Sequence, residues 1–314
     1  MDFSEMLPAS LSSGEQQIEE SERIPVVKHE LQRSVLVLNG LSFNIHSSGP
    51  KDGEPVLLLH GFPQFADIWS ELMLSLAGDG FRTFALDQRG YSAGARPAEI
   101  ESYDVTHLTS DVLAQADSLG IVSFHLIGHD WGGFLAWKLA AEHPDRVRTL
   151  SILSTPHVDA FLEAVKGDPD QKARSQYIEF FKMPGQVAES FFLADDAKRL
   201  RDVYQGKASE PQVSSNVRRL SEPGALTSVL NWYRALDLDM RVGKVRVPTL
   251  YMWGNEDRSL GKTAALATAD YVDAPYQFEM LNGHGHWLLE ETPQKISTLI
   301  QNHLRTDHSN AHPA

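Results

Sequence analysis

A carboxylate between glycines is the most informative feature of this chain. Asp130 stands in residues 128–133, which read Gly-His-Asp-Trp-Gly-Gly, and the apolar stretch 124–127 precedes them. Glycines on both sides let the backbone pass through a strained turn from a strand into a helix, so the carboxylate would sit at the strand tip beside the positive end of the helix. We therefore expect a nucleophile elbow that carries Asp where Ser is more usual.

The identity of this nucleophile limits the chemistry. A serine alkylated at a saturated carbon becomes an ether, which a histidine-activated water cannot cleave, whereas an alkylated aspartate becomes an ester, which it can. Asp130 therefore indicates displacement at a saturated carbon. Epoxides and alkyl halides suit such a two-step scheme, and peptides and simple esters do not.

An acid and a base follow later in the chain. Asp257 comes directly after a predicted strand, and His286 lies in the loop 283–287, which reads Gly-His-Gly-His-Trp. With Asp130 they give the order nucleophile, acid, histidine that is typical of α/β-hydrolases. Because ligands of open parallel sheets bind at the carboxyl ends of the strands, we expect the three side chains to meet there.

Neighbouring residues compete for these two roles. Glu256 is the alternative to Asp257, with Asp159 as a more distant candidate, and His284 is the alternative to His286. Loop position favours Asp257 over the adjacent glutamate.

Hydrolysis of an ester also needs donors for the developing oxyanion. The backbone N–H of Trp131, the residue after the nucleophile, is one expected donor. The second is expected from the early loop 60–63, which reads His-Gly-Phe-Pro, at Phe62. Two backbone donors from separate loops would then converge on one site.

The motifs at 60–63, 128–133 and 285–287 together resemble those of the α/β-hydrolase-fold epoxide hydrolases, over most of the chain from residue 35 to 304. The resemblance favours His286 as the base. It also implies that two lid tyrosines, Tyr177 and Tyr233 here, hydrogen-bond the epoxide oxygen. The chemistry needs such groups in any case, because ring opening builds an alkoxide that a phenol can stabilise and protonate.

The reaction implied by this resemblance has two steps. Asp130 attacks a ring carbon and forms an ester, and water activated by His286 then hydrolyses that ester to release a vicinal diol. No cofactor and no metal are expected.

Alternating strand and helix patterns predict a mostly parallel, doubly wound sheet of the α/β-hydrolase fold. The expected strands are 26–38 and 41–46, joined by an Asn-Gly hairpin turn, and then 56–60, 81–87, 124–127, 147–153, 248–254 and 276–281. The expected helices are 68–77, 106–119, 134–141, 262–269 and 292–304.

The alternation fails in the middle of the chain, which predicts an inserted module. Residues 156–236 carry helical patterns broken by Pro and Gly, so we expect a helical lid there and an α/β-hydrolase core in 23–155 and 237–314. Residues 1–22 contain six acidic and no basic residues and are expected to form a disordered tail.

The composition of the chain restricts the classes of ligand and the kinds of chemistry that we expect. The chain has 314 residues, a formal net charge of −14 and no cysteine. Such a charge disfavours nucleic acid, which needs a basic surface, and the lack of cysteine excludes thiol chemistry. We expect a cytoplasmic protein without a membrane span that acts on a small apolar epoxide with water, and a homodimer is left open.

The sequence fits three other functions less well. A haloalkane dehalogenase shares the Asp nucleophile, acid and histidine, but its halide site needs a donor side chain where this chain has Phe62, and it has no use for paired tyrosines. A fluoroacetate-type dehalogenase would place arginines near the elbow, where Trp131 and Phe134 stand instead. A ligand sensor without catalysis is disfavoured by the intact set of reactive groups.

Overall fold

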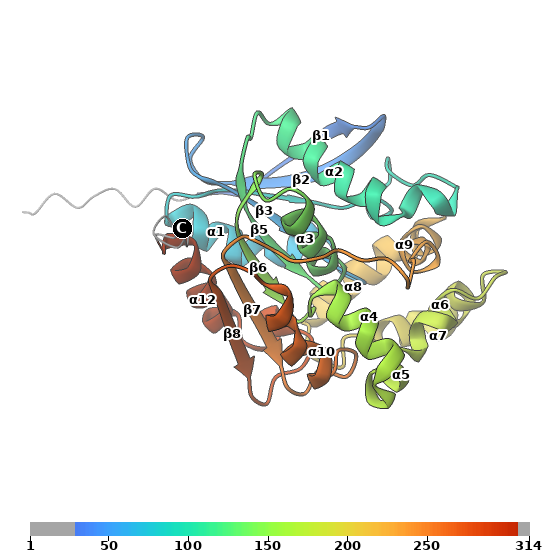
Figure 1. Ribbon diagram of the computed structural model, residues 1–314. Helices are drawn as coiled ribbons and strands as arrows, with labels where there is room; N and C mark the ends of the chain where they lie inside the picture. The colour runs from blue at the N-terminus through green and yellow to red at the C-terminus, as the bar shows by residue number, and fades with distance from the viewer. Residues whose placement is uncertain (1–28, 307–314) are drawn as a thin grey trace, which may run out of the picture.

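A computed structural model of the chain describes residues 29–306, so the tail expected at 1–22 lies outside the described residues. Within 29–306, eight strands form one sheet in the order β1-β2-β4-β3-β5-β6-β7-β8 (Figure 1). β2 pairs antiparallel with β1 and β4, and every other pair is parallel. The strands are β1 (Gln32–Leu38), β2 (Leu41–Ser48), β3 (Pro55–Leu59), β4 (Arg82–Leu86), β5 (Phe124–His129), β6 (Val147–Leu153), β7 (Thr249–Gly254) and β8 (Tyr276–Leu281).

The first two strands form the predicted hairpin. Asn39 and Gly40 both have positive φ, at 51° and 77°, which is the backbone of a two-residue turn that matches the twist of the strands. Of the predicted strand 26–38, residues 26–28 lie outside the described residues, and within the described part β1 begins at Gln32, which lies opposite Ser47 of β2.

Helices cover the two faces of the sheet. They are η1 (Ala66–Trp69), α1 (Ser70–Gly78), η2 (Ile100–Tyr103), α2 (Val105–Ser118), α3 (Trp131–Glu142), α10 (Lys262–Ala267), η3 (Thr268–Tyr271), α11 (Leu288–Glu291) and α12 (Pro293–Arg305). Successive side chains of a strand point to opposite faces. Leu58 of β3 therefore shares an apolar cluster with Met73 of α1 and Ile296 of α12. Its neighbour Leu57 belongs to the cluster on the other face, with Leu135 of α3.

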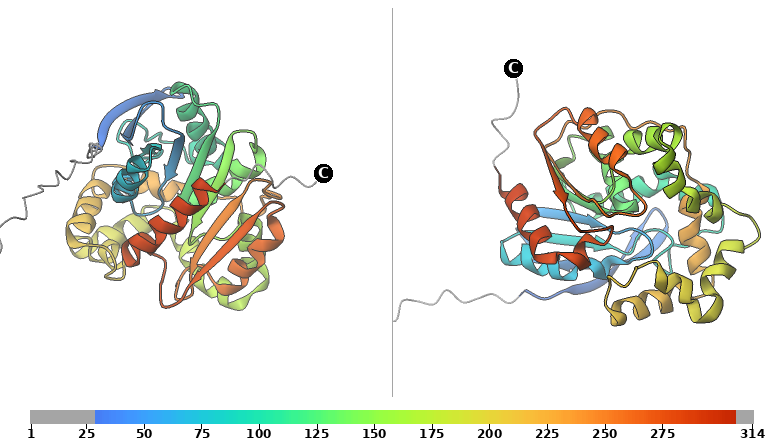
Figure 2. Two further views of the ribbon diagram at one scale, coloured as in Figure 1. Left: turned by 90° about the vertical axis from the view of Figure 1, so that its left-hand side faces the viewer. Right: turned by 90° about the horizontal axis from the view of Figure 1, so that it is seen from below.

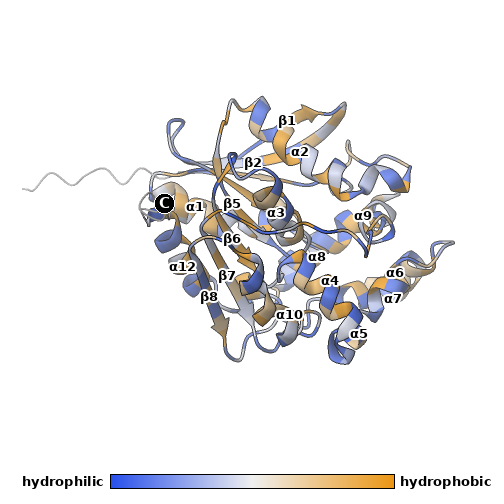
Figure 3. Cartoon of the chain, viewed as in Figure 1, coloured by the Kyte–Doolittle hydropathy of each residue, from blue (hydrophilic) through white to orange (hydrophobic). Residues whose placement is uncertain are grey.

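The hydropathy of the chain follows this arrangement. Figure 3 shows the central strands mostly in the hydrophobic colour, while the outer helices carry hydrophilic stretches. β5 is buried along its whole length, as expected for a parallel strand covered on two faces. The sheet is thus a rigid platform, and the carboxyl end of β5 lies near its centre.

The segment between β6 and β7, residues 154–248, contains helices and no strand, and we refer to it as the lid. Its helices are α4 (Val158–Gly167), α5 (Pro169–Arg174), α6 (Gln176–Phe181), α7 (Val187–Asp202), α8 (Glu210–Leu220) and α9 (Ala225–Arg234). Figures 1 and 2 show α5, α6 and α7 gathered on one side of the molecule, away from α1 and α12. The division of the chain at residues 156 and 236 into separate modules stays a prediction.

No helix in residues 29–306 has the length and apolar character needed to cross a membrane.

Candidate active site

Asp130 lies on a strained elbow between β5 and α3. Its φ of 53° and ψ of −122° fall in a region that L residues rarely adopt. The turn is so tight that a Cβ on Gly132 would lie 2.0 Å from the carbonyl oxygen of Leu59, so only glycine fits there. The carbonyl oxygen of Asp130 accepts a hydrogen bond from Thr155 Oγ1 at 2.8 Å. These contacts hold the carboxylate at the strand end.

The two carboxylate oxygens of Asp130 have different partners. Oδ1 accepts a hydrogen bond from the backbone N–H of Phe62 at 2.7 Å, and Oδ2 faces Nε2 of His286 at 3.4 Å. The early loop comes this close because Gly61 has no side chain, and a Cβ there would lie 2.2 Å from Oδ1. The backbone N–H of the adjacent Trp131 contributes to lowering the pKa of the carboxyl. The structure therefore brings the two predicted backbone donors to the predicted nucleophile.

Asp257 fixes the orientation of the histidine. Nδ1 of His286 hydrogen-bonds Asp257 Oδ2 at 2.8 Å. The other oxygen, Oδ1, accepts the backbone N–H groups of Ser259 at 2.8 Å and Leu260 at 3.0 Å. With its side chain fully buried, Asp257 holds the imidazole so that Nε2 points toward Asp130.

The charges of these three groups depend on one another. Burial alone would lower the pKa of His286, but the carboxylates of Asp257 and Asp130 raise it to about 10. Burial alone would raise the pKa of Asp130, but hydrogen bonding and charge from His286 hold it below its ordinary value. The free site therefore contains an imidazolium between two carboxylates.

The two predicted lid tyrosines line the same cavity as Asp130. Tyr177 comes from α6 and Tyr233 from α9, and their ring centroids are 6.1 Å apart. Burial, and after it the charge of Asp130, raises the pKa of both phenols above the ordinary value. The phenols therefore stay protonated at neutral pH and are available as hydrogen-bond donors.

The competing candidates have other contacts. Asp159 accepts the backbone N–H groups of residues 242 and 243 at 2.8 and 2.9 Å, where it fixes a lid loop. His284 lies 3.9 Å from the carboxylate of Glu291. Glu256 is exposed at the surface. The geometry therefore favours Asp257 and His286 over these alternatives.

Two buried residues that the sequence does not single out hold the backbone of the histidine. The carbonyl oxygen of His286 accepts a hydrogen bond from Ser154 Oγ at 2.8 Å and a second from His129 Nε2 at 3.0 Å. Burial lowers the pKa of His129 to about 4, so its ring is neutral and donates through Nε2. The position of Ser154, directly after a strand of the parallel sheet, is the one signal by which the sequence could have indicated it.

A short lid segment that follows α7, residues 204–207, contacts the loops that carry Phe62 and His286. Tyr204 donates a hydrogen bond to the carbonyl oxygen of Pro63 at 2.8 Å, in the loop that carries the first backbone donor. Lys207 pairs at 2.9 Å with Glu291, whose carboxylate accepts the backbone N–H of Gly285 at 3.0 Å, beside the histidine. The lid thus supports the positions of both loops.

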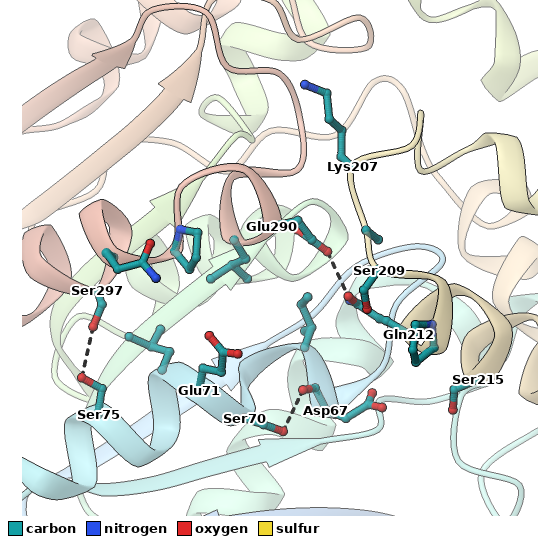
Figure 4. Close-up of a pocket in the computed structure, with 17 residues that line it drawn as sticks. Asp67, Ser70, Glu71, Ser75, Lys207, Ser209, Gln212, Ser215, Glu290 and Ser297 are labelled. Carbon is teal, nitrogen blue, oxygen red and sulfur yellow. Dashed lines mark hydrogen bonds between the residues drawn. The ribbon is translucent and has the colours of Figure 1, made fainter.

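Two hollows of different character lie near these elements. The reactive side chains, including Asp130 and His286, open on a cavity of about 580 Å³. A hollow of about 880 Å³ between α1, α8 and α12 is lined mainly by Ser, Gln and acidic residues (Figure 4). On its border Gln212 donates to Glu290 at 3.2 Å. This larger hollow contains none of the predicted site residues, so chemistry rather than size identifies the site.

Known proteins are similar to this chain in fold and in sequence. A family model described as alpha/beta hydrolase fold matches residues 54–293. Epoxide hydrolase 3 of Xenopus tropicalis is 34% identical over 281 residues, which cover 86% of this chain and 76% of the relative. Epoxide hydrolase 4 of Mus musculus is 32% identical, with coverages of 86% and 78%. The crystal structure of a Bacillus megaterium epoxide hydrolase with an inhibitor matches with a TM-score of 0.79 at 27% identity, covering 87% and 100% of the two chains.

The chain therefore belongs to the α/β-hydrolase fold family, and the fold predicted from the sequence is confirmed. Within that family it is an epoxide hydrolase-like enzyme, since relatives from Xenopus tropicalis, Mus musculus and Mycobacterium tuberculosis that are 30–34% identical carry that name.

Proposed function

We propose that this enzyme opens an epoxide to a vicinal diol through a covalent ester of Asp130. The observation that carries the proposal is that the two carboxylate oxygens of Asp130 have different partners. Oδ1 accepts a backbone N–H at 2.7 Å and Oδ2 faces the histidine at 3.4 Å, while Asp130 lines the cavity together with the two phenols. The names of the relatives support an epoxide as substrate.

Ring opening is the first step. Oδ2 of Asp130 attacks a ring carbon, the carbon–oxygen bond of the ring breaks, and the ester bond forms. The epoxide oxygen gains negative charge and takes a proton from Tyr177 or Tyr233. Because burial and the charge of Asp130 raise the pKa of these phenols, they are still protonated when the substrate binds and give a proton to the oxygen as its charge builds. At the end of this step the site contains the alkylated carboxyl group of Asp130 beside one phenolate.

Alkylation prepares the base for the second step. The ester no longer carries the charge of Asp130, which is one of the two carboxylates that raise the pKa of His286. The imidazolium therefore becomes more acidic as the ester forms, and its proton restores the phenol. His286 is left neutral, so it can accept a proton from water.

Hydrolysis of the ester completes the cycle. Water gives one proton to His286 and attacks the carboxyl carbon of Asp130. The oxyanion develops on Oδ1, which already accepts a hydrogen bond from the backbone N–H of Phe62. The intermediate then collapses and the bond between the carboxyl carbon and Oδ2 breaks. Oδ2 leaves as a hydroxyl oxygen of the diol with the second proton of the water, and the water oxygen stays in the carboxylate of Asp130. Carboxylate and imidazolium are regenerated as at the start.

A direct product assay tests this function against the halide alternative. The enzyme is incubated separately with styrene oxide and with 1-bromobutane, while diol and bromide are measured. We expect diol from the epoxide and no bromide above the rate without enzyme. Bromide release without diol formation would overturn the proposal in favour of a dehalogenase.

The covalent route has its own test. His286→Gln should stop at the ester, so the intact protein should gain the mass of one epoxide, located on the peptide that contains Asp130. A matched variant, His284→Gln, changes the other histidine of the same loop and should show no accumulation. Diol formation by the His286→Gln protein at the wild-type rate would contradict the assignment.

A further inference from the structure

Space around Asp130 is divided into two unequal arms. On one side lies the cavity of about 580 Å³, and on the other a pocket of about 40 Å³. Asp130, Tyr177 and Tyr233 line both of them, so the reacting ring must lie where the two arms meet. Each ring carbon of an epoxide held there would direct its substituent into a different arm.

The narrow arm has rigid apolar walls. Its lining residues besides those named above are Trp131, Phe134, Thr155, Phe161, Ile178, Leu236 and Leu260. All of them are buried, with exposed fractions of 4–7%. A cavity of about 150 Å³ is known to hold a benzene ring and one of about 10–15 Å³ a water molecule. The narrow arm therefore has room for a hydrogen or a methyl group and not for a ring.

The wide arm has aromatic walls and a polar entrance. The walls are formed by Phe62, Phe180, Phe181, Phe191, Phe192 and Trp287. Ring centroids in this cluster are 4.9 Å apart for Phe180 and Phe191 and 5.3 Å apart for Phe181 and Phe192. Exposed polar residues, among them Gln176 and Arg258, line the other side of the same cavity and mark its opening to solvent. Several ring faces and edges are thus presented to one substituent.

We propose that the substrate is an epoxide with one flat aromatic substituent and nothing larger than a methyl group on the other ring carbon. The aromatic group lies in the wide arm, and the small end of the epoxide lies in the narrow arm. This inference rests on the proposed function, because the position of the ring between the arms follows from attack by Asp130. The difference in volume between the arms is what separates this class from epoxides with two large groups.

A matched series of substrates tests the narrow arm. Styrene oxide, trans-β-methylstyrene oxide and trans-stilbene oxide keep one phenyl group and place hydrogen, methyl or a second phenyl on the other carbon. We expect kcat/KM for the first two to agree within about tenfold and that for stilbene oxide to be lower by on the order of 100-fold, because a ring overfills the narrow arm. Both trans-β-methylstyrene oxide and trans-stilbene oxide have two substituted ring carbons and at least one benzylic carbon, so the comparison of these two separates the size of the narrow arm from intrinsic reactivity.

A second comparison tests the wide arm. 1,2-Epoxyoctane is a terminal epoxide of similar size to styrene oxide but has a flexible chain. We expect its KM to be about 2- to 10-fold higher, because it lacks the edge-to-face contacts of a ring. Equal or lower KM values for the alkyl epoxide would overturn the aromatic part of the proposal.

Two variants enlarge the narrow arm. Leu236→Ala and Leu260→Ala each remove a wall side chain, and at least one should raise the ratio of stilbene oxide to styrene oxide turnover about tenfold. Leu230→Ala is the control, because Leu230 is a fully buried leucine of α9 that lines neither arm. It should lower stability and leave the ratio unchanged. The ratio is measured within one preparation, so partial loss of folded protein does not affect it.

The outcomes separate this inference from the function on which it rests. If stilbene oxide is opened as fast as styrene oxide, the substrate class is wrong and the epoxide hydrolase mechanism stands. If no member of the series gives diol and no ester forms on Asp130, the proposed function itself fails. An unchanged ratio in both enlarged variants would also overturn the role of the narrow arm.

Discussion

The core and the lid contribute to the site by different kinds of contact. Core groups are fixed by directed hydrogen bonds: Asp130 through its own carbonyl and carboxylate, and Asp257 through two backbone N–H groups. Lid groups are fixed mainly by ring packing, as for Tyr233, whose ring lies 5.1 Å from that of Trp131 and 4.8 Å from that of Phe181.

This difference indicates which part of the proposed reaction depends on the core and which part depends on the lid. Making and cleaving an ester requires exact alignment of charged groups, which hydrogen bonds at strand ends provide. Holding a substrate requires shape and apolar surface, which packed rings provide. We infer that the core determines displacement at saturated carbon, and that the lid determines which saturated carbon is presented.

The largest effect should come from removing the core nucleophile. Asp130→Ala should reduce kcat/KM by at least ~10⁴, because no ester can form. Diol formation and thermal unfolding should be measured together. Asp159→Asn alters a buried carboxylate that the structure places outside the site, and it should lower stability while the folded protein keeps its kcat. Activity of Asp130→Ala above a hundredth of wild type would assign the nucleophile to another group.

Changing the lid phenols should give the next largest effect, and only on ring opening. The double variant Tyr177→Phe with Tyr233→Phe should slow alkylation by about 10²–10⁴, the usual contribution of a positioned proton donor. Single-turnover mass measurements should show that the ester, once formed, is hydrolysed at close to the wild-type rate. Tyr103→Phe is the control, because Tyr103 is a buried tyrosine that does not line the cavity and whose hydroxyl donates a hydrogen bond to the carbonyl oxygen of Pro97. Equal slowing of both steps would contradict the division between core and lid.

A pH series should separate the two steps within the wild-type enzyme. His286 has a pKa of about 10 beside ionised Asp130, and that pKa falls when the ester removes the charge. Ester hydrolysis needs neutral His286, so its rate should rise with pH through the lowered pKa and then level off. Quenched samples should therefore contain more alkylated protein at pH 5.5 than at pH 8.5. Greater accumulation at the higher pH would contradict histidine as the base.

The smallest effect should come from the support of the histidine backbone. Ser154→Ala removes one of the two hydrogen bonds to the carbonyl of His286, and loss of about 1 kcal/mol of positioning should slow ester hydrolysis about fivefold. Alkylation should be unaffected. Ser151→Ala is the matched control, because Ser151 lies in β6, the strand that Ser154 follows, and its Oγ is buried without a hydrogen-bond partner in residues 29–306. If the two variants behave alike, Ser154 has no positioning role.

The sequence predicted what is encoded locally. β5, β6 and β8 are apolar or alternating runs between turns, and their observed bounds lie within a few residues of the predicted ones. The elbow was also predictable, because glycines around Asp130 report a local backbone constraint. Contacts between distant segments were not: Ser154 and His286 are 132 residues apart, and Tyr204 and Pro63 are 141 apart. The unequal arms likewise depend on side chains from several elements, which no local pattern records.

The segment at residues 204–207 has a consequence for recombining parts of such enzymes. Through Tyr204 and Lys207 the lid reaches the carbonyl of Pro63 and, by way of Glu291, the loop of the histidine. A chimera that took its lid from another hydrolase would thus also replace two supports of the loops that carry Phe62 and His286. Transfer of substrate preference between family members should succeed when these two residues and their partners are kept together as one unit.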